Sequence, residues 1–265
     1  MNNMRTKSLF IAIPLISGFT IFYVVPYAYV FYYSFFGENN SVNLNNIIVV
    51  SNNIYFRLAI SNTALFILIS MPILIVLSYL LAHLIIKNNN RIFRLLLFLP
   101  ILVPSASIAT LCKQIFESFA PFVKSFLPVH IYILFVWKNI GLICLIIIGG
   151  LTRIPNEIYE ASVIDGANIF QKHKNITLPL LSPILFFCFL ISIIQSFKIF
   201  REVYIIYGSH PPENLYMIQN FIFNKFNKLD YSELSAGTII FTGMILLFFV
   251  SLGLIGYFMF IRKRG

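Results

Sequence analysis

The residue types that most often carry catalysis are not arranged for it in this sequence. There is no GxxxxGK[ST] phosphate loop, no HExxH, no paired cysteine motif and no GxSxG. The histidines have no partner at metal-ligand spacing and are interpreted as interface or loop residues: His83, His130, His173 and His210. The cysteines stand apart inside apolar runs, which favours helix packing: Cys112, Cys144 and Cys188. The sequence therefore predicts no active site, metal or cofactor bound by this chain.

Polar side chains inside apolar runs are the next candidates for chemistry. Such groups are costly in lipid, and they usually face protein or a water-filled cavity. The candidates are Asn62, Thr63, Ser78, Asn139, Ser192 and Gln195. Each is compatible with hydrogen bonding between helices as well as with contact to a solute. Asn139 and Gln195 are preferred for solute contact because the runs that carry them flank the same polar stretch.

That stretch, Arg153 to Pro183, is the longest polar interruption between two strongly apolar runs. Pro155 suits the first turn of a helix and Gly166 suits the position just past its end. One face of this helix is apolar at i, i+4 and i+7: Ile154, Ile158 and Ala161. About ten residues at 1.5 Å each give a rod of roughly 15 Å, too short to cross a bilayer. A further helical turn is expected after Gly166, ending near Pro179.

The composition requires contact with lipid. Hydrophobic residues make up 59% of the 265 residues and charged residues only 11%, whereas soluble domains carry about 25% charged residues. We predict an all-α membrane protein forming one transmembrane domain over residues 1–265. Six membrane helices are expected at about 8–36, 62–86, 95–116, 131–151, 178–197 and 234–261.

The distribution of charge predicts the orientation. An even number of crossings places both termini and the polar stretch on one side of the membrane. That side holds the larger share of the cations: Arg5, Lys7, Lys87, Arg91, Arg94, Arg153, Lys172, Lys174, Arg262, Lys263 and Arg264. Most acidic residues, Glu202 among them, fall on the other side. The positive-inside rule then makes the termini cytoplasmic, and the net charge of +10 indicates a membrane surface and not nucleic acid.

The polar stretch also carries a spaced motif. EAS at residues 160–162 is followed by Gly166 and then by ITLP at residues 176–179. This pattern resembles the cytoplasmic signature loop of permease subunits in bacterial ABC importers. DGA at residues 165–167 and Pro183 resemble its carbohydrate branch, the maltose, glycerol-phosphate and multiple-sugar type, although Ser162 replaces a more usual alanine. The opening apolar run resembles the first permease of that branch.

The resemblance implies a coupling helix between the fourth and fifth membrane helices, within residues 152–177, that docks on an ATPase. The residues implied to couple are Ile154, Ile158, Glu160, Ala161, Ser162, Asp165 and Gly166. Glu160 would accept a charge-assisted hydrogen bond, and Asp165 would bond the following backbone. The implied partners are a second permease, two ATP-binding-cassette subunits that bind ATP and Mg²⁺, and an extracytoplasmic solute-binding protein in a bacterial cell membrane.

The same resemblance implies a sugar or oligosaccharide as the solute. Because sugars are held by hydrogen bonds and aromatic stacking, Trp137 joins Asn139, Ser192 and Gln195 as a candidate in the substrate path. The segments 117–130 and 208–212 depart from the family pattern, so the solute itself is not carried over from relatives.

Three alternatives remain at this point. One is an importer for a non-sugar solute such as a sugar phosphate, polyamine or peptide. Another is a secondary carrier that works without ATP, which would need acidic residues deep in its membrane helices. The last is a membrane scaffold that transports nothing.

Overall fold

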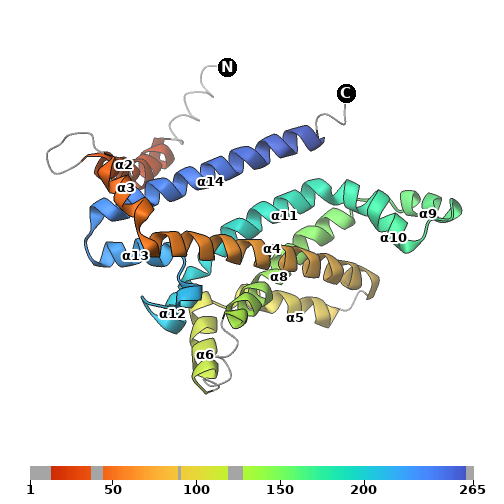
Figure 1. Cartoon of the computed structure of the whole chain (residues 1–265). Coiled ribbons are helices and arrows are strands. Elements are labelled where there is room, and N and C mark those ends of the chain that lie inside the picture. Colours follow the sequence, from red (N-terminus) through yellow and green to blue (C-terminus); the bar gives the residue numbers. More distant parts are fainter. Residues whose placement is uncertain (1–12, 37–43, 89–90, 119–127, 261–265) are drawn as a thin grey trace. The chain divides into compact units, whose positions relative to one another are not determined.

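The computed structural model describes residues 13–36, 44–88, 91–118 and 128–260, and these are almost entirely helical (Figure 1). Several sequence predictions lie outside the described residues. They are the start of the first span at residues 8–12, most of the link at 117–130, and the terminal cations Arg5, Lys7, Arg262, Lys263 and Arg264.

The chain forms two compact units, which we call the terminal unit (residues 1–58 and 221–265) and the central unit (residues 59–220). Helix α4 (Ile54–Asn88) and helix α13 (Ile218–Asn227) pass from one unit into the other. The single permease domain over residues 1–265 stays a prediction.

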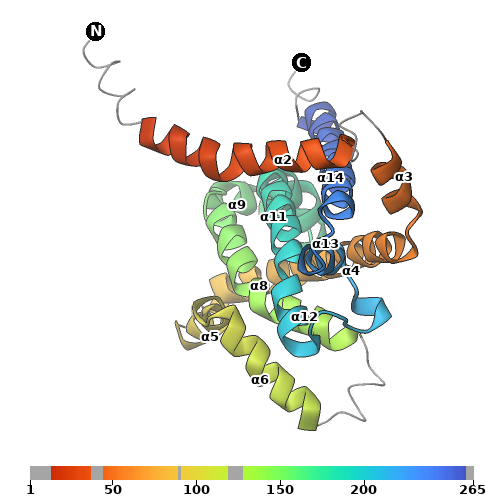
Figure 2. The same cartoon turned by 90° about the vertical axis from the view of Figure 1, so that its left-hand side faces the viewer.

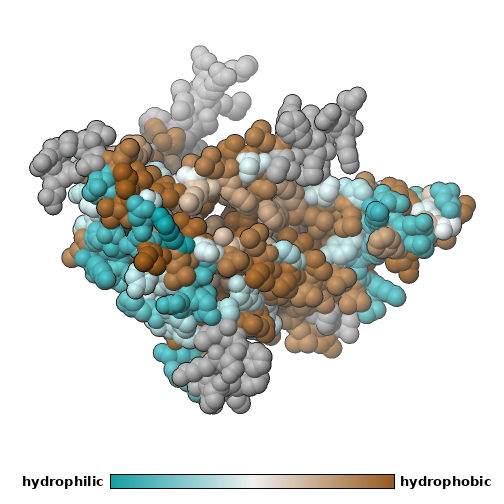
Figure 3. Space-filling model, viewed as in Figure 1, coloured by the Kyte–Doolittle hydropathy of each residue, from teal (hydrophilic) through white to brown (hydrophobic). Residues whose placement is uncertain are grey.

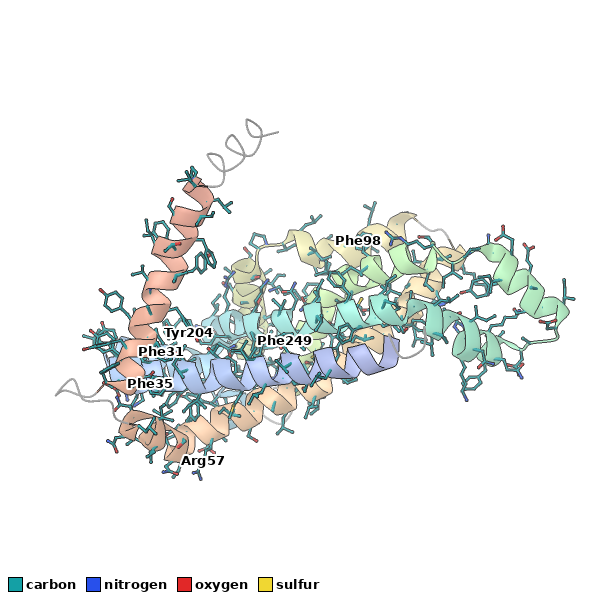
Figure 4. All side chains as sticks on the ribbon, turned by 90° about the horizontal axis from the view of Figure 1, so that it is seen from above. Phe31, Phe35, Arg57, Phe98, Tyr204 and Phe249 are labelled. Atoms are coloured by element: carbon teal, nitrogen blue, oxygen red, sulfur yellow. The ribbon has the colours of Figure 1, made fainter. Side chains whose placement is uncertain are left out.

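In the terminal unit, α14 (Tyr231–Phe260) packs against α2 (Val25–Phe35) and α3 (Asn45–Asn52). A π-helical turn, η1 (Thr20–Val24), leads directly into α2, so helix runs through residues 13–35. Phe31 and Phe35 lie next to each other on α2, with ring centroids 4.7 Å apart (Figure 4). The Asn-rich residues 45–52 form α3, and helix α4 begins just after them at Ile54.

An ion-pair cluster joins α13 to the start of α14. Lys225 contacts Asp230 at 3.0 Å and Glu233 at 2.6 Å. Partial burial disfavours the charge of Lys225, but hydrogen bonds to Glu233 and Asp230 outweigh burial and raise its pKa.

In the central unit, α8 (Val129–Leu151) lies between α5 (Arg91–Leu102) and α11 (Leu178–Lys198) (Figure 2). Apolar side chains of α8 recur on faces that point to both neighbours, and the core includes Phe135, Ile143, Ile147 and Leu181. These side chains are almost fully buried. Because α5 and α11 pack on either side of α8, the core holds in place the helices that carry the polar residues named from the sequence.

Among the described residues, five helices are long and apolar enough to cross a membrane: Ile13–Phe35, Ile54–Asn88, Val129–Leu151, Ile169–Tyr207 and Tyr231–Leu254. The predicted third span is different. It consists of α5 and α6 (Ser105–Ser118), bent by 99° where they meet. Pro104 follows Val103 at the bend; a proline disfavours helical backbone in the residue before it and has no N–H to donate. The predicted span over 95–116 is thus made of two helices that meet at a bend, and the described residues give six spans only if the bent pair counts as one.

The fifth span begins earlier than predicted. Helix α10 (Ile169–Lys172) passes through the π turn η2 (His173–Thr177) into α11, so no helix ends near Pro179. Pro179 lies in the first turn of α11, directly after the wider π turn, and the helix continues past it. The polar segment after residue 198 also contains α12 (Phe200–Tyr207), the 3₁₀ turn η3 (Glu213–Leu215) and part of α13.

Large apolar side chains cover much of the outside of the central unit. Leu68, Leu80 and Phe187 are each about half exposed or more. Only 28% of the most apolar window of α4 is buried, and Figure 3 shows wide hydrophobic areas on the face in view. A soluble protein rarely exposes so much contiguous apolar surface, which indicates lipid as the neighbour of these helices.

Helices α8 and α5 approach closely at Gly141. A Cβ atom at this position would lie 2.3 Å from the backbone oxygen of Leu97. We expect Gly141→Ala to force the two backbones apart and to destabilise the purified protein by about 1–3 kcal/mol, measured as a lower melting temperature in detergent.

Gly149, on the same helix, provides the control. A Cβ there meets nothing within 4 Å, so Gly149→Ala gains helix propensity of about 1 kcal/mol at most and does not lower the melting temperature. Equal melting temperatures for the two variants would contradict the close approach at Gly141.

Candidate functional site

The central unit contains a polar cavity of about 300 Å³. Its lining comes from α5, α6, α8, α11 and α12: Ile101, Ser105, Lys138, Asn139, Leu142, Gln195, Lys198 and Arg201. Asn139 and Gln195, preferred from the sequence for solute contact, thus line the same cavity from α8 and α11. Their role in a substrate path stays a prediction.

The other sequence candidates lie elsewhere. Ser192 is buried and donates to the carbonyl of Cys188 at 2.7 Å, and it is not part of the cavity lining. Trp137 is 46% exposed and does not line the cavity.

Asn62, Thr63 and Ser78 serve the fold of the central unit. Asn62 donates to the carbonyls of Glu213 at 2.5 Å and Tyr216 at 3.0 Å. The Thr63 hydroxyl accepts from the backbone N–H of Ile218 at 3.0 Å. Ser78 is buried and donates to the carbonyl of Ile140 at 3.4 Å, so all three residues make hydrogen bonds within the fold.

A buried ion pair lies beside the cavity. The ammonium of Lys138 pairs with the carboxylate of Glu202 and also donates to the hydroxyl of Ser105 at 2.6 Å. Glu202 is only 1% exposed, although its polar surroundings in the sequence had suggested the outer surface. The reason is that α12 packs against α6 and directs this residue inward, toward α8. The pair therefore links α6, α8 and α12 at one end of the cavity.

Two cations in the lining were missed as site residues. They are Lys198 and Arg201, which the sequence places at the end of an apolar run and just beyond it. A signal was present, because Gln195, Lys198 and Arg201 recur every third residue, and a helix places such residues on neighbouring positions. What the sequence did not indicate was that the helix continues past the apolar run into α12.

The loop between α8 and α11 contains the predicted short helix. Helix α9 (Asn156–Ile164) begins after Pro155 and ends in a left-handed turn at Gly166, where φ is +76°. The N–H of Ala167 donates to the carbonyl of Ser162 at 2.9 Å, and the N–H of Gly166 to that of Val163 at 3.0 Å, which is a Schellman motif. The predicted helix and its glycine stop are confirmed. The expected backbone bond from the Asp165 side chain is absent among the described residues, since the turn is closed by the backbone.

The predicted apolar face of α9 is divided in two. Ile154, just before the helix, packs back against the core of the central unit, and Ser162 is buried. The remaining positions face outward: Ile158, Glu160, Ala161 and Asp165. Val163 and Ile164, which the sequence analysis did not name, are 59% and 87% exposed. Figure 1 shows α9 and α10 together at one end of the central unit, and Figure 3 shows hydrophobic and hydrophilic residues intermixed there.

Several hydrogen bonds fix this loop on the helices around it. The hydroxyl of Tyr79 on α4 contacts Nδ1 of His173 at 2.7 Å, and that of Tyr159 on α9 contacts the hydroxyl of Thr177 at 3.0 Å. The rings of His83 and His173 are 4.8 Å apart, so these two histidines are not isolated as the sequence had suggested. A capping box formed by Asn168 and Gln171 begins α10.

The Lys138–Glu202 pair gives the first test of this site. Lys138→Met leaves a buried carboxylate without its counter-charge, and we expect it to destabilise the protein by about 3 kcal/mol. Adding Glu202→Gln removes the charge and should recover most of the melting temperature. A double variant that melts no higher than Lys138→Met would show that the loss of stability in Lys138→Met does not come from the unpaired charge of Glu202.

The hydrogen bond between Tyr79 and His173 gives the second test of this site. Tyr79→Phe removes one partly buried hydrogen bond, worth about 1 kcal/mol, so amide exchange in residues 169–177 should become roughly five times faster. Tyr132→Phe, on α8 and away from the loop, is the control and should leave that exchange unchanged. Identical amide exchange in residues 169–177 of the two variants would show that the Tyr79–His173 hydrogen bond does not stabilise this segment.

Comparison with known proteins agrees with this geometry. The arabinooligosaccharides transport system permease AraP of Bacillus subtilis is 29% identical over 263 residues, covering 88% of this chain and 82% of that protein. The trehalose/maltose transport system permease MalF of Thermococcus litoralis is 36% identical over 113 residues, which is 43% of this chain and 38% of that protein.

A solved structure has the same fold. It is that of a bacterial ABC transporter involved in the import of the acidic polysaccharide alginate, and one of its chains superposes with a TM-score of 0.74 at 18% identity over 95% of both chains. Residues 65–264 match the family described as the inner membrane component of binding-protein-dependent transport systems. This chain belongs to that family.

Proposed function

We propose that this chain is the permease subunit that forms, with a second homologous permease, the translocation path for a sugar or oligosaccharide in an ATP-driven importer. One observation carries the proposal: α8 and α11, which flank the α9–α10 loop along the chain, both line the polar cavity. A displacement of the loop therefore reaches the two helices that carry Asn139 and Gln195.

Helix α9 is proposed to be the cytoplasmic coupling helix. Its exposed Ile158, Val163 and Ile164 suit an apolar groove on an ATP-binding-cassette subunit, and Glu160 between them suits a cationic partner. The cassette subunits would bind ATP and Mg²⁺, since the sequence carries no phosphate loop. Closure of those subunits would move α9 as a rigid body, because the Schellman turn and the Tyr159–Thr177 bond hold it on α10 and η2.

A carbohydrate is the solute class that the relatives support. Arabinooligosaccharides, trehalose or maltose, and alginate are named for the proteins compared above. A second solved structure, with a TM-score of 0.72 at 17% identity, is that of the alginate transporter with its pentasaccharide-bound periplasmic protein. We propose an extracytoplasmic binding protein as the partner that delivers the solute here.

The orientation follows from the positive-inside rule. The described cations near α9 and the end of α4 are Lys87, Arg153, Lys172 and Lys174. We propose that this end of the central unit and both termini face the cytoplasm of a bacterial cell.

Coupling gives a direct test of the proposal. Glu160→Lys reverses the charge that would meet the partner, and Gly166→Asp places a side chain where φ is +76°, a strain of about 1–2 kcal/mol. We expect either variant to insert normally but to lose most ATP-dependent uptake of labelled arabinotriose or maltotriose by proteoliposomes that contain the assembled importer.

Glu117→Lys is the matched charge reversal, on an exposed residue of α6 away from α9, and should transport as the wild type does. Wild-type uptake by Glu160→Lys and Gly166→Asp would exclude α9 as the coupling element. Uptake of putrescine or a tripeptide in place of the sugars would favour the non-sugar importer, and uptake without ATP would favour a secondary carrier.

A further inference from the structure

The cavity carries a surplus of positive charge. Three cations line it, Lys138, Lys198 and Arg201. The carboxylate of Glu202 neutralises Lys138, with which it forms the buried pair. Lys198 and Arg201 then remain as charges that nothing in the described central unit balances.

Both remaining cations are open to a ligand. Their side chains are exposed and make no ion pair or hydrogen bond with another side chain of the part of the chain that the structure describes. They lie three residues apart, where α11 passes into α12, one turn beyond Gln195. An anion between them would thus meet an ammonium, a guanidinium and an amide from one side.

The neutral polar groups of the lining add few acceptors. Asn139 donates one of its two amide N–H groups to the carbonyl of Phe135 at 2.8 Å, and its carbonyl oxygen is one of the few acceptors in the lining. The hydroxyl oxygen of Ser105 already accepts from Lys138. A neutral sugar presents hydroxyls that both donate and accept, whereas a carboxylate or phosphate only accepts. The donor-rich lining therefore matches an anion better.

The walls of the cavity strengthen this preference. Ile101 and Leu142 are apolar and lower the local dielectric, which increases the attraction between charges. No aromatic ring is among the described residues that line the cavity, so the stacking surface that commonly holds a neutral sugar ring is missing from it.

We infer that the cavity selects a carbohydrate that bears an anionic group, either a carboxylate or a phosphate, and that Lys198 and Arg201 are the residues that recognise this group. The inference rests on the function proposed above and narrows its solute class; its phosphate case is the sugar phosphate that the sequence analysis gave among the alternative solutes. Arg201 is suited to a bidentate contact with two oxygens of the anion, and Lys198 contributes a point charge beside it.

The test uses the assembled importer in nanodiscs without a binding protein, so that only the membrane cavity is measured. Equilibrium dialysis compares tritiated galactose, galacturonate and galactose 6-phosphate, which share one hexose ring. The wild type should bind at least one of the two anions about tenfold more tightly than galactose, the gain expected from one charge-assisted hydrogen bond. The tighter of the two anions distinguishes a carboxylate from a phosphate.

Lys198→Gln and Arg201→Gln should each weaken binding of the preferred anion about tenfold, with a change of about twofold or less for galactose. Lys198→Arg and Arg201→Lys keep the charge and should lose less. Lys87→Gln, an exposed cation at the end of α4 that does not line the cavity, is the control and should bind as the wild type.

Equal affinity for all three hexoses, or anion binding unchanged in the two glutamine variants, would overturn the inference. ATP-dependent uptake of neutral sugars would then still support the proposed function. Uptake of a polyamine or peptide with no uptake of any sugar would overturn the proposed function itself, so the two failures are distinguishable.

Discussion

The ion pair between Lys138 and Glu202 is the interaction on which the central unit most depends. A carboxylate that is 1% exposed persists only with a counter-charge, so α12 must fold back until Glu202 reaches α8. Lys138 also bonds Ser105, and α6 is thereby included in the same contact. The bend between α5 and α6, the turn from α11 into α12 and the shape of the cavity are all compatible with this one arrangement.

The second constraint concerns helix α9, which is held in place by its neighbours in the chain. Helix α9 is too short to form a core of its own, and its conformation comes from Pro155, the left-handed Gly166 and the contacts of Ile154 with the core. The outward residues are therefore free of a folding role. This separation, in which one side is tied to the bundle and the other is exposed, fits the coupling role proposed for α9.

Much of this arrangement was predictable from local chemistry. The ends of α9 follow from a proline and a glycine at helix spacing, and five of the apolar runs became helices long enough to cross a membrane. The exceptions arise where the hydropathy of the sequence does not predict the direction of the backbone. Val103 and Pro104 lie in an apolar run that looks continuous, yet the missing N–H and the steric clash bend the chain by 99°. Glu202, Lys198 and Arg201 look like solvated charges because only tertiary contacts bring α12 to α8.

The length of α4 has one more consequence. Between Asn62, which holds the backbone of Glu213 and Tyr216, and Tyr79, which holds His173, the helix rises about 26 Å at 1.5 Å per residue. The segment around η3 and the segment around η2 are thus attached to α4 at two points that are 17 residues apart, about 26 Å. Only Pro72 interrupts its ladder of backbone bonds. A tilt of α4 would therefore move the segments around η3 and η2 together, and Pro72 is the position at which the helix would bend.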